Sequence, residues 1–203
     1  MHENILIIGL TGSICSGKTL IADFFKEKNA IILDADQISK DLSTPGQQAW
    51  HEIINEFGEE IIHANKSINR KLLADIVFNN PKQLKKLEQI LHPKIKDEIL
   101  KKINQEQKKS IVVIDAPLLL EAKFDDIIDL LIVVSCKKSI LLERAQKRNS
   151  STIQEIKKRL KYQMPLKNKI KKADYIINNN TTINETRRQF ELVWKKITKK
   201  QIH

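Results

Sequence analysis

The 203-residue sequence predicts an α/β fold, in which helices cover both faces of a parallel five-stranded sheet. Five short apolar runs are continuous rather than alternating, which is typical of strands buried on both faces. Segments with helical spacing separate the runs and favour right-handed β-α-β crossovers. A glycine-rich turn joins the first run to the first helical segment. The predicted strands are Ile5–Ile8, Ile31–Leu33, Ile111–Ile114, Leu130–Val134 and Tyr175–Ile177.

The turn after the first strand fits the phosphate-binding pattern G-x-x-x-x-G-K-[ST]. Its glycines let successive backbone N–H groups point at phosphate oxygens, and a helix from about Lys18 to Lys26 adds the positive end of its dipole. We expect Lys18 to reach the β- and γ-phosphates and the Thr19 hydroxyl to ligate Mg²⁺. A turn that binds nothing is the alternative, but the position between a strand and a helix favours a nucleoside-triphosphate site. The motif residues are Gly12, Ser13, Ile14, Cys15, Ser16, Gly17, Lys18 and Thr19.

Two acidic residues, Asp34 and Asp36, follow the second predicted strand directly. In open α/β sheets, ligands bind beyond the carboxyl ends of the strands, so these carboxylates suit metal binding or general-base catalysis on a substrate hydroxyl. Alternatively, either residue caps the next helix. If the strand extends through both positions, their side chains project to the same side and one supports the other.

The long interval before the third strand contains helical patterns and predicts an inserted helical subdomain. Asn80-Pro81 begins the third of these patterns, with Pro81 suited to a first helical turn. His92 lies at the junction of two predicted helices, where a histidine is more often packed or solvent-exposed than a ligand. None of the five histidines has metal-ligand spacing with another. The helical patterns cover Gln47–Phe57, Arg70–Phe78, Lys82–Leu91 and Pro93–Gln105.

The third apolar run ends in Asp115 and resembles a Walker B strand, whose aspartate belongs to the Mg²⁺ shell. This pattern is common, so a metal role for Asp115 stays open. Pro117 predicts an extended turn after the strand. Glu121, at the end of that turn, either faces the active site or caps a helix.

A basic helical stretch between Ile140 and Lys172, interrupted at Met164-Pro165, is typical of a mobile lid over a phosphate site. Its arginines either bind phosphates bidentately or form a salt-bridged helix face. The segment Asn168–Lys171 begins like the guanine-binding motif N-K-x-D but ends in lysine, which disfavours a guanine-dependent switch protein. The arginines are Arg144, Arg148 and Arg159.

Composition narrows the class further. The formal net charge is +11, yet lysines are spread along the chain and aromatic residues make up 5%, so a polyanionic small molecule is favoured over nucleic acid. We see no signal peptide and no apolar run long enough for a bilayer. Two cysteines suggest no disulfide framework. We therefore expect a cytoplasmic protein without a membrane partner, and the oligomeric state stays open, with a monomer favoured.

Over nearly its whole length, the chain resembles the dephospho-CoA kinase family. The phosphate loop alone occurs in many families, whereas the ordered set of motifs is specific. The matching segments are Gly9–Gly12 with Ser16–Lys18, Asp34-Ala35-Asp36, Phe57-Gly58, Asn69-Arg70, Leu73-Ala74, Val77-Phe78, Leu87-Glu88, Ile90–Pro93, Pro117–Leu119 with Glu121, Arg144 with Arg148, and Gln163-Met164 through Lys169 to Ala173–Asn178.

The resemblance implies a three-layer P-loop kinase that transfers the γ-phosphoryl group of ATP to the ribose 3′-hydroxyl of dephospho-CoA, giving CoA and ADP, the last step of coenzyme A biosynthesis. Mg²⁺ would accompany ATP. A single domain would comprise a core (about 1–45, 108–139 and 173–203), a helical acceptor-binding insert (about 46–107) and a lid (about 140–172).

The resemblance also implies residue roles. The catalytic residues would be Asp36, as the base for the 3′-hydroxyl, Lys18 and Arg144. Arg148 and Asn178 would join the glycine-rich loop in binding ATP, with Arg148 in the lid and Asn178 near the adenine. Acceptor-binding residues would be Asp34, Arg70, His92, Pro117, Leu118 and Glu121.

This chain departs from the family pattern at several positions. Ser13 and Cys15 replace two loop glycines, Leu20 replaces a threonine and Leu120 replaces a phenylalanine. Gly12 and Gly17 remain, so we expect a working site. The alternatives are a kinase for another small acceptor, such as a nucleoside monophosphate or a sugar acid, and a nucleic-acid-binding protein that uses ATP as an allosteric ligand.

Overall fold

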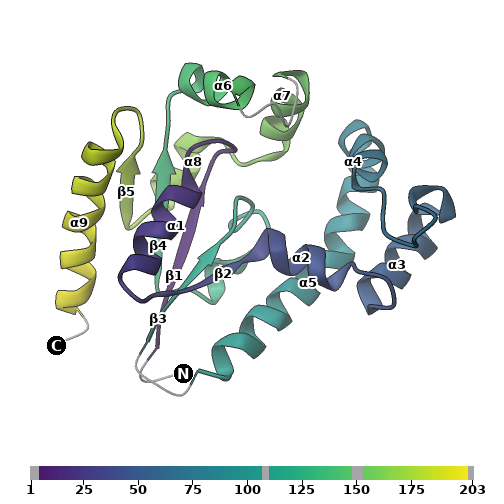
Figure 1. Ribbon diagram of the computed structural model, residues 1–203, viewed down its shortest axis with the longest axis horizontal. Coiled ribbons are helices and arrows are strands. Elements are labelled where there is room, and N and C mark those ends of the chain that lie inside the picture. Colours follow the sequence, from purple (N-terminus) through teal and green to yellow (C-terminus); the bar gives the residue numbers. More distant parts are fainter. Residues whose placement is uncertain (1–4, 107–109, 148–152, 201–203) are drawn as a thin grey trace. The chain divides into compact units, whose positions relative to one another are not determined.

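The computed structural model describes residues 5–106, 110–147 and 153–200 (Figure 1). Its sheet has the order β2-β3-β1-β4-β5. β1 runs parallel to both β3 and β4, and β5 runs parallel to β4. The predicted parallel five-stranded sheet is therefore confirmed, and β1 continues beyond its predicted end at Ile8 to Gly12. The strands are β1 (Ile5–Gly12), β2 (Ile31–Asp34), β3 (Ser110–Asp115), β4 (Leu130–Ser135) and β5 (Tyr175–Asn178).

The chain divides into two compact units, of which the first comprises residues 1–33 and 108–203. Besides the strands it contains five helices and a short 3₁₀ turn among its described residues. These elements are α1 (Lys18–Glu27), η2 (Phe124–Asp126), α6 (Lys138–Lys147), α7 (Ile153–Tyr162), α8 (Leu166–Lys172) and α9 (Ile183–Lys200).

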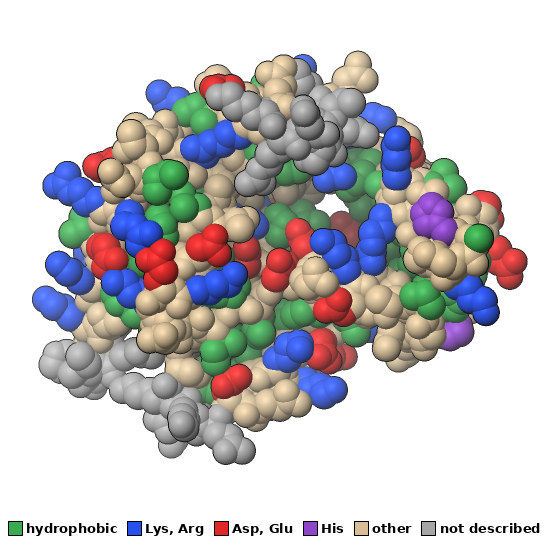
Figure 2. All heavy atoms as spheres, in the orientation of Figure 1, with side chains coloured by type: hydrophobic (Ala, Val, Ile, Leu, Met, Phe, Trp, Pro, Cys, Tyr) green, Lys and Arg blue, Asp and Glu red, His purple; other side chains and the backbone are tan. Residues whose placement is uncertain are grey.

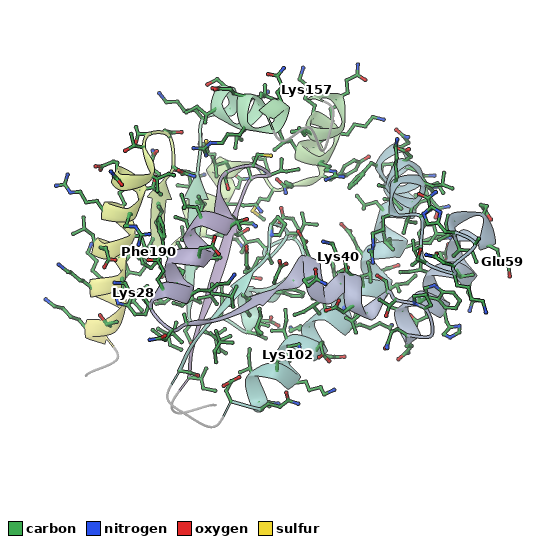
Figure 3. The ribbon with its side chains drawn as sticks, viewed as in Figure 1. Lys28, Lys40, Glu59, Lys102, Lys157 and Phe190 are labelled. Carbon is green, nitrogen blue, oxygen red and sulfur yellow. The ribbon has the colours of Figure 1, made fainter. Side chains whose placement is uncertain are left out.

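Helices lie on both faces of the sheet because successive strand residues point in opposite directions. Ile8 and Leu10 of β1 belong to a buried cluster with residues of α1 and α9. Phe190 points from α9 toward α1 (Figure 3), where its ring centroid is 4.9 Å from that of Phe25. On the opposite face, Thr11 Oγ1 accepts a hydrogen bond from Lys169 of α8.

The second compact unit, residues 34–107, is helical. Asparagine caps begin two of its helices: Asn69 Oδ1 accepts from the backbone N–H of Leu72, and Asn80 Oδ1 accepts from that of Lys82. Its elements are α2 (Ala35–Leu42), α3 (Gln48–Phe57), η1 (Glu59–Ile61), α4 (Arg70–Asn79) and α5 (Pro81–Asn104). Its buried cluster consists of Ile53, Phe57, Ile61, Ile68, Leu73 and Val77.

The two helices predicted at 82–91 and 93–105 form one continuous helix, so the predicted break at His92-Pro93 is wrong. Proline has no N–H to donate and its ring crowds the preceding turn, which normally interrupts a helix. The apolar spacing nevertheless continues through Pro93, because Leu91 and Ile95 lie four residues apart on one face. Burial of Ile95 and Ile99 on that face stabilises the second half.

Within the described residues, no helix has both the length and the hydrophobicity that a membrane span requires. On the face shown in Figure 2, lysine and arginine side chains lie among acidic ones rather than in one continuous patch.

Candidate functional site

The glycine-rich loop lies between β1 and α1. Steric contacts require glycine at both glycine positions of its G-x-x-x-x-G-K-[ST] motif. A Cβ at Gly12 would come within 2.6 Å of the Val134 carbonyl oxygen and 2.7 Å of Ser16 Oγ. Gly17 has a φ of 94°, and a Cβ there would collide with Asn179. α1 starts at Lys18 without a side-chain cap, so its first N–H groups keep hydrogen-bonding capacity for an anion.

Cys15 also adopts the left-handed conformation, with a φ of 60°. It lies in the Ser13–Ser16 turn, closed by a 3.0 Å hydrogen bond from the Ser16 N–H to the Ser13 carbonyl. A left-handed conformation costs a non-glycine residue about 1–2 kcal/mol. The loop therefore demands positive φ at position 15, where this chain carries a cysteine.

We expect Cys15→Gly to raise the free energy of unfolding by about 0.5–1 kcal/mol, because relief of the left-handed strain outweighs the extra freedom of glycine in the unfolded chain. Urea denaturation measures the change. Ser13→Gly is the matched control: Ser13 does not have positive φ, so glycine there should bring no gain. A Cys15→Gly protein that is less stable than the unaltered one would contradict the strain argument.

Lys18 and Asp115 form an ion pair beside the loop, with 2.8 Å between Lys18 Nζ and Asp115 Oδ1. Asp115 ends β3 next to β1, where it pairs in register with Leu10. The exposed Thr19 hydroxyl and the Asp115 carboxylate are hard oxygen donors, which Mg²⁺ prefers. No group of three or more His, Cys, Asp or Glu side chains capable of holding a metal occurs among the described residues. These donors therefore fit a Mg²⁺ that takes most of its ligands from phosphate and water.

Ser16 provides a second indication of a phosphate site. Its side chain is 1% exposed, and its Oγ has no hydrogen-bond partner among the described residues. A buried hydroxyl without a partner carries a free-energy penalty. A phosphate oxygen bound in the loop would supply that partner.

The carbonyl oxygen of Ser16 is held from two directions. Asn179 Nδ2 donates to it at 2.8 Å, and Arg144 Nη1 donates at 3.3 Å. Arg144 Nη2 also donates to the Asn179 carbonyl at 3.0 Å, and Thr186 Oγ1 donates to Asn179 Oδ1 at 3.0 Å. Arg144 thus lies at the loop, and its predicted roles in the lid and in catalysis stay predictions.

Cys136 lies next to the same guanidinium, since Arg144 Nη1 donates to its Sγ at 3.6 Å. Burial raises the pKa of the Cys136 thiol, and the positive charge of Arg144 opposes that rise. At neutral pH the Cys136 thiol is therefore protonated.

A buried lysine connects α8 to the turn after β3. Lys169 has no exposed surface; its Nζ donates to the Pro117 carbonyl at 2.6 Å and lies 3.0 Å from Glu121 Oε1. Burial lowers the pKa of Lys169, and the charge and hydrogen bond of Glu121 offset only part of this effect. Two of the predicted acceptor residues, Pro117 and Glu121, thus contact Lys169, and a third, Leu118, is half-buried in the same turn.

Asp34 acts as the cap that the sequence left as an alternative, because its Oδ1 accepts from the backbone N–H of Gln37 at 3.0 Å. β2 ends at Asp34, and Asp36 lies in the first turn of α2. The strand therefore does not extend through both residues, and the condition under which their side chains would project to the same side is not met, because capping by Asp34 favours the helix at that point. Both side chains are exposed.

Arg70 and His92 belong to the same unit as α2. Arg70 Nη2 donates to the Lys40 carbonyl at 3.2 Å and to Ser43 Oγ at 3.0 Å, which links the start of α4 to the end of α2. Desolvation of the guanidinium lowers the pKa of Arg70, and the nearby Asp41 carboxylate opposes this effect. His92 lies half-buried within α5.

The remaining predicted ATP contacts are Arg148 and Asn178. Arg148 lies outside the described residues. Asn178 is exposed at the end of β5, where its Oδ1 accepts from the Asn180 N–H at 3.1 Å. Its predicted place near the adenine stays a prediction. Its neighbour Asn179 contacts the loop, which the sequence did not predict; its only local signal is the position directly after a strand.

This chain matches the model of a known protein family and is similar to several known proteins. The family model described as dephospho-CoA kinase matches residues 6–185. A dephospho-CoA kinase from Lactobacillus acidophilus is 39% identical over 193 residues, covering 94% of this chain and 96% of the relative.

Two solved structures extend the comparison. The structure titled dephospho-CoA kinase from Campylobacter jejuni has 28% identity and a TM-score of 0.68, covering 96% of this chain and 98% of the other. A crystal structure from Thermus thermophilus has a TM-score of 0.81 at 24% identity, with 95% and 98% covered, and supports the fold alone.

Proposed function

The chain belongs to the dephospho-CoA kinase family of ATP-dependent kinases, and we propose that it phosphorylates the ribose 3′-hydroxyl of dephospho-CoA, the last step of coenzyme A biosynthesis. The observation that supports this most strongly is the phosphate loop, with Gly17 in a left-handed conformation and a buried Ser16 hydroxyl that has no hydrogen-bond partner in the part of the chain that the structure describes. In this reading ATP is the donor and dephospho-CoA the acceptor.

The chain's own groups suit phosphoryl transfer by positioning and charge neutralisation. Backbone N–H groups of the loop and of the first turn of α1 hold the phosphates, and the Lys18 ammonium neutralises charge that develops on the transferred group. Lys18 pairs with Asp115, so bound phosphates would compete with that carboxylate for the lysine. Thr19 and Asp115 would hold Mg²⁺, which would neutralise negative charge on the phosphates.

The acceptor roles rest on the family resemblance. Asp36 serves as the base for the 3′-hydroxyl, and Asp34, Arg70 and His92 belong to the acceptor-binding region. Pro117, Leu118 and Glu121 lie in one turn of the first unit. The cytoplasm is the proposed location, in keeping with two free cysteines.

An acceptor screen tests the proposed substrate. ADP release is measured with Mg²⁺ and ATP in the presence of dephospho-CoA, a nucleoside monophosphate, a sugar acid or no acceptor. Dephospho-CoA should stimulate release strongly and yield CoA. Strong stimulation by another acceptor, with none by dephospho-CoA, would replace the proposed substrate. Salt-sensitive retention on DNA or RNA, with no acceptor stimulating turnover, would instead favour a nucleic-acid-binding protein.

Asp36→Asn should lower kcat by about 10²–10⁴-fold, because the amide no longer accepts the proton of the hydroxyl. The dissociation constant for ATP should stay unchanged, since the substitution alters only the acceptor side. Steady-state kinetics and calorimetry give the two quantities. Asp97→Asn, at an exposed position of α5, is the control for loss of one surface carboxylate. Unchanged turnover in Asp36→Asn would remove this residue as the base.

A further inference from the structure

The short segment between α7 and α8 is bonded directly to the phosphate loop. Gln163 Oε1 accepts a hydrogen bond from the Ile14 N–H at 3.1 Å. The next residue, Met164, donates its backbone N–H to Glu121 Oε1 at 2.6 Å. Adjacent residues of one segment thus contact the loop and the turn after β3.

This segment has a rigid anchor. Glu121 is held by Lys169, whose fully buried Nζ also donates to the Pro117 carbonyl. Lys169 itself lies on α8, a few residues after Met164. The anchored backbone at Met164 therefore limits where the side chain of Gln163 lies, and Gln163 meets Ile14 with little loss of freedom.

Gln163 contacts the loop next to its strained residue, Cys15. Ile14 and Cys15 are the two central residues of the Ser13–Ser16 turn, and Cys15 is in the strained left-handed conformation. At the other end of the turn, Asn179 holds the Ser16 carbonyl. The turn is therefore held at two points, by Gln163 at the N–H of its second residue and by Asn179 at the carbonyl of its last.

We infer that Gln163 is a positioning residue, which keeps the phosphate loop in its ATP-binding shape through the Ile14 N–H and makes the order of the loop depend on the α7–α8 segment. Its contact is to the backbone of the loop, so it acts through the loop. The inference rests on the loop being the ATP site and is independent of the identity of the acceptor.

Gln163→Met tests this role, because methionine has a similar length and lacks the carbonyl acceptor. Loss of one neutral hydrogen bond should raise the dissociation constant for ATP about fivefold, measured by calorimetry without acceptor. The KM for ATP should rise by a similar factor, whereas kcat should change less than about twofold. Gln154→Met, at an exposed position of α7, is the control for the same chemical change.

A second readout follows the loop without activity or nucleotide. The Cys15 thiol is partly exposed, so its alkylation rate reports loop opening, and peptide mass spectrometry separates it from buried Cys136. Gln163→Met should speed alkylation of Cys15 about threefold or more, while Gln163→Glu, which keeps an acceptor oxygen, should stay near the unaltered rate. A role confined to α7–α8 packing would lower the melting temperature alone. Unaltered ATP affinity and Cys15 alkylation in Gln163→Met would overturn the inference.

Discussion

Lys18→Met should lower kcat by about 10²–10³-fold, since it removes a positive charge aimed at the transferred phosphoryl group. Methionine preserves most of the side-chain length, so the loss is one of charge rather than of packing. Lys18 Nζ lies 2.8 Å from Asp115 Oδ1, and both side chains are mostly shielded from solvent. The substitution also leaves that carboxylate without its cation, which would disfavour phosphate nearby.

Steady-state kinetics with saturating ATP and acceptor give the loss in kcat, and a melting curve shows whether the fold is retained. Lys26→Met is the matched control, because Lys26 lies on the same helix and forms only an exposed pair with Asp23 at 3.3 Å. It should leave kcat unaltered. If Lys18→Met retained most of the turnover, the assigned role of Lys18 in catalysis would be wrong.

Lys169→Met should cost about 3–5 kcal/mol of unfolding free energy, which is the usual result when one partner of a buried ion pair is removed. Lys169 is fully buried between Glu121 and the Pro117 carbonyl. Without the ammonium, the Glu121 carboxylate remains in a poorly solvated position and the carbonyl loses a donor. Denaturation in urea measures the loss.

Two comparisons separate burial from loss of charge. Lys172→Met removes a lysine from the same helix whose pair with Asp125 is exposed, 52% and 41% respectively, so its effect should stay below about 1 kcal/mol. The double variant Lys169→Met/Glu121→Gln removes both charges and keeps an acceptor for the Met164 N–H, so it should recover part of the lost stability. Equal losses of unfolding free energy in all three variants would show that burial of the Lys169 charge does not increase its contribution to stability.

The strands and the phosphate loop could be predicted from the sequence because their signals are local. A buried parallel strand is a short continuous apolar run, as in Leu130–Val134, and the loop requires glycine at fixed spacing. Gly12 and Gly17 follow this logic, since a Cβ at either position would meet neighbouring atoms.

The partners of the loop could not be predicted because they come from distant parts of the chain. Gln163 and Asn179 reach residues that lie far away in sequence, and neither position has a local pattern that indicates its partner. Lys169 belongs to a run of lysines, in which composition suggests exposure; only the folded chain shows that one of them is buried.

Local rules also failed where two of them competed. Proline usually ends a helix, but the uninterrupted apolar face of α5 outweighs it at Pro93. Asp34 ends β2 and also caps α2 through its bond to Gln37, so the helix begins where a longer strand would have continued. The roles of Asp36, Arg70 and His92 toward an acceptor stay predictions.

The central position of β1 has a consequence for how the protein is made. Both of its neighbours, β3 and β4, are synthesised about a hundred residues later, since Ile5 pairs with Ser110 and Ile8 with Leu130. During translation β1 therefore stays apolar and unpaired until β3 and β4 have been synthesised. The helices of residues 34–107, in contrast, can form their local contacts within the nascent chain before that point. We expect shielding of β1 by ribosome-associated chaperones to matter more for the yield of active protein than shielding of any later strand.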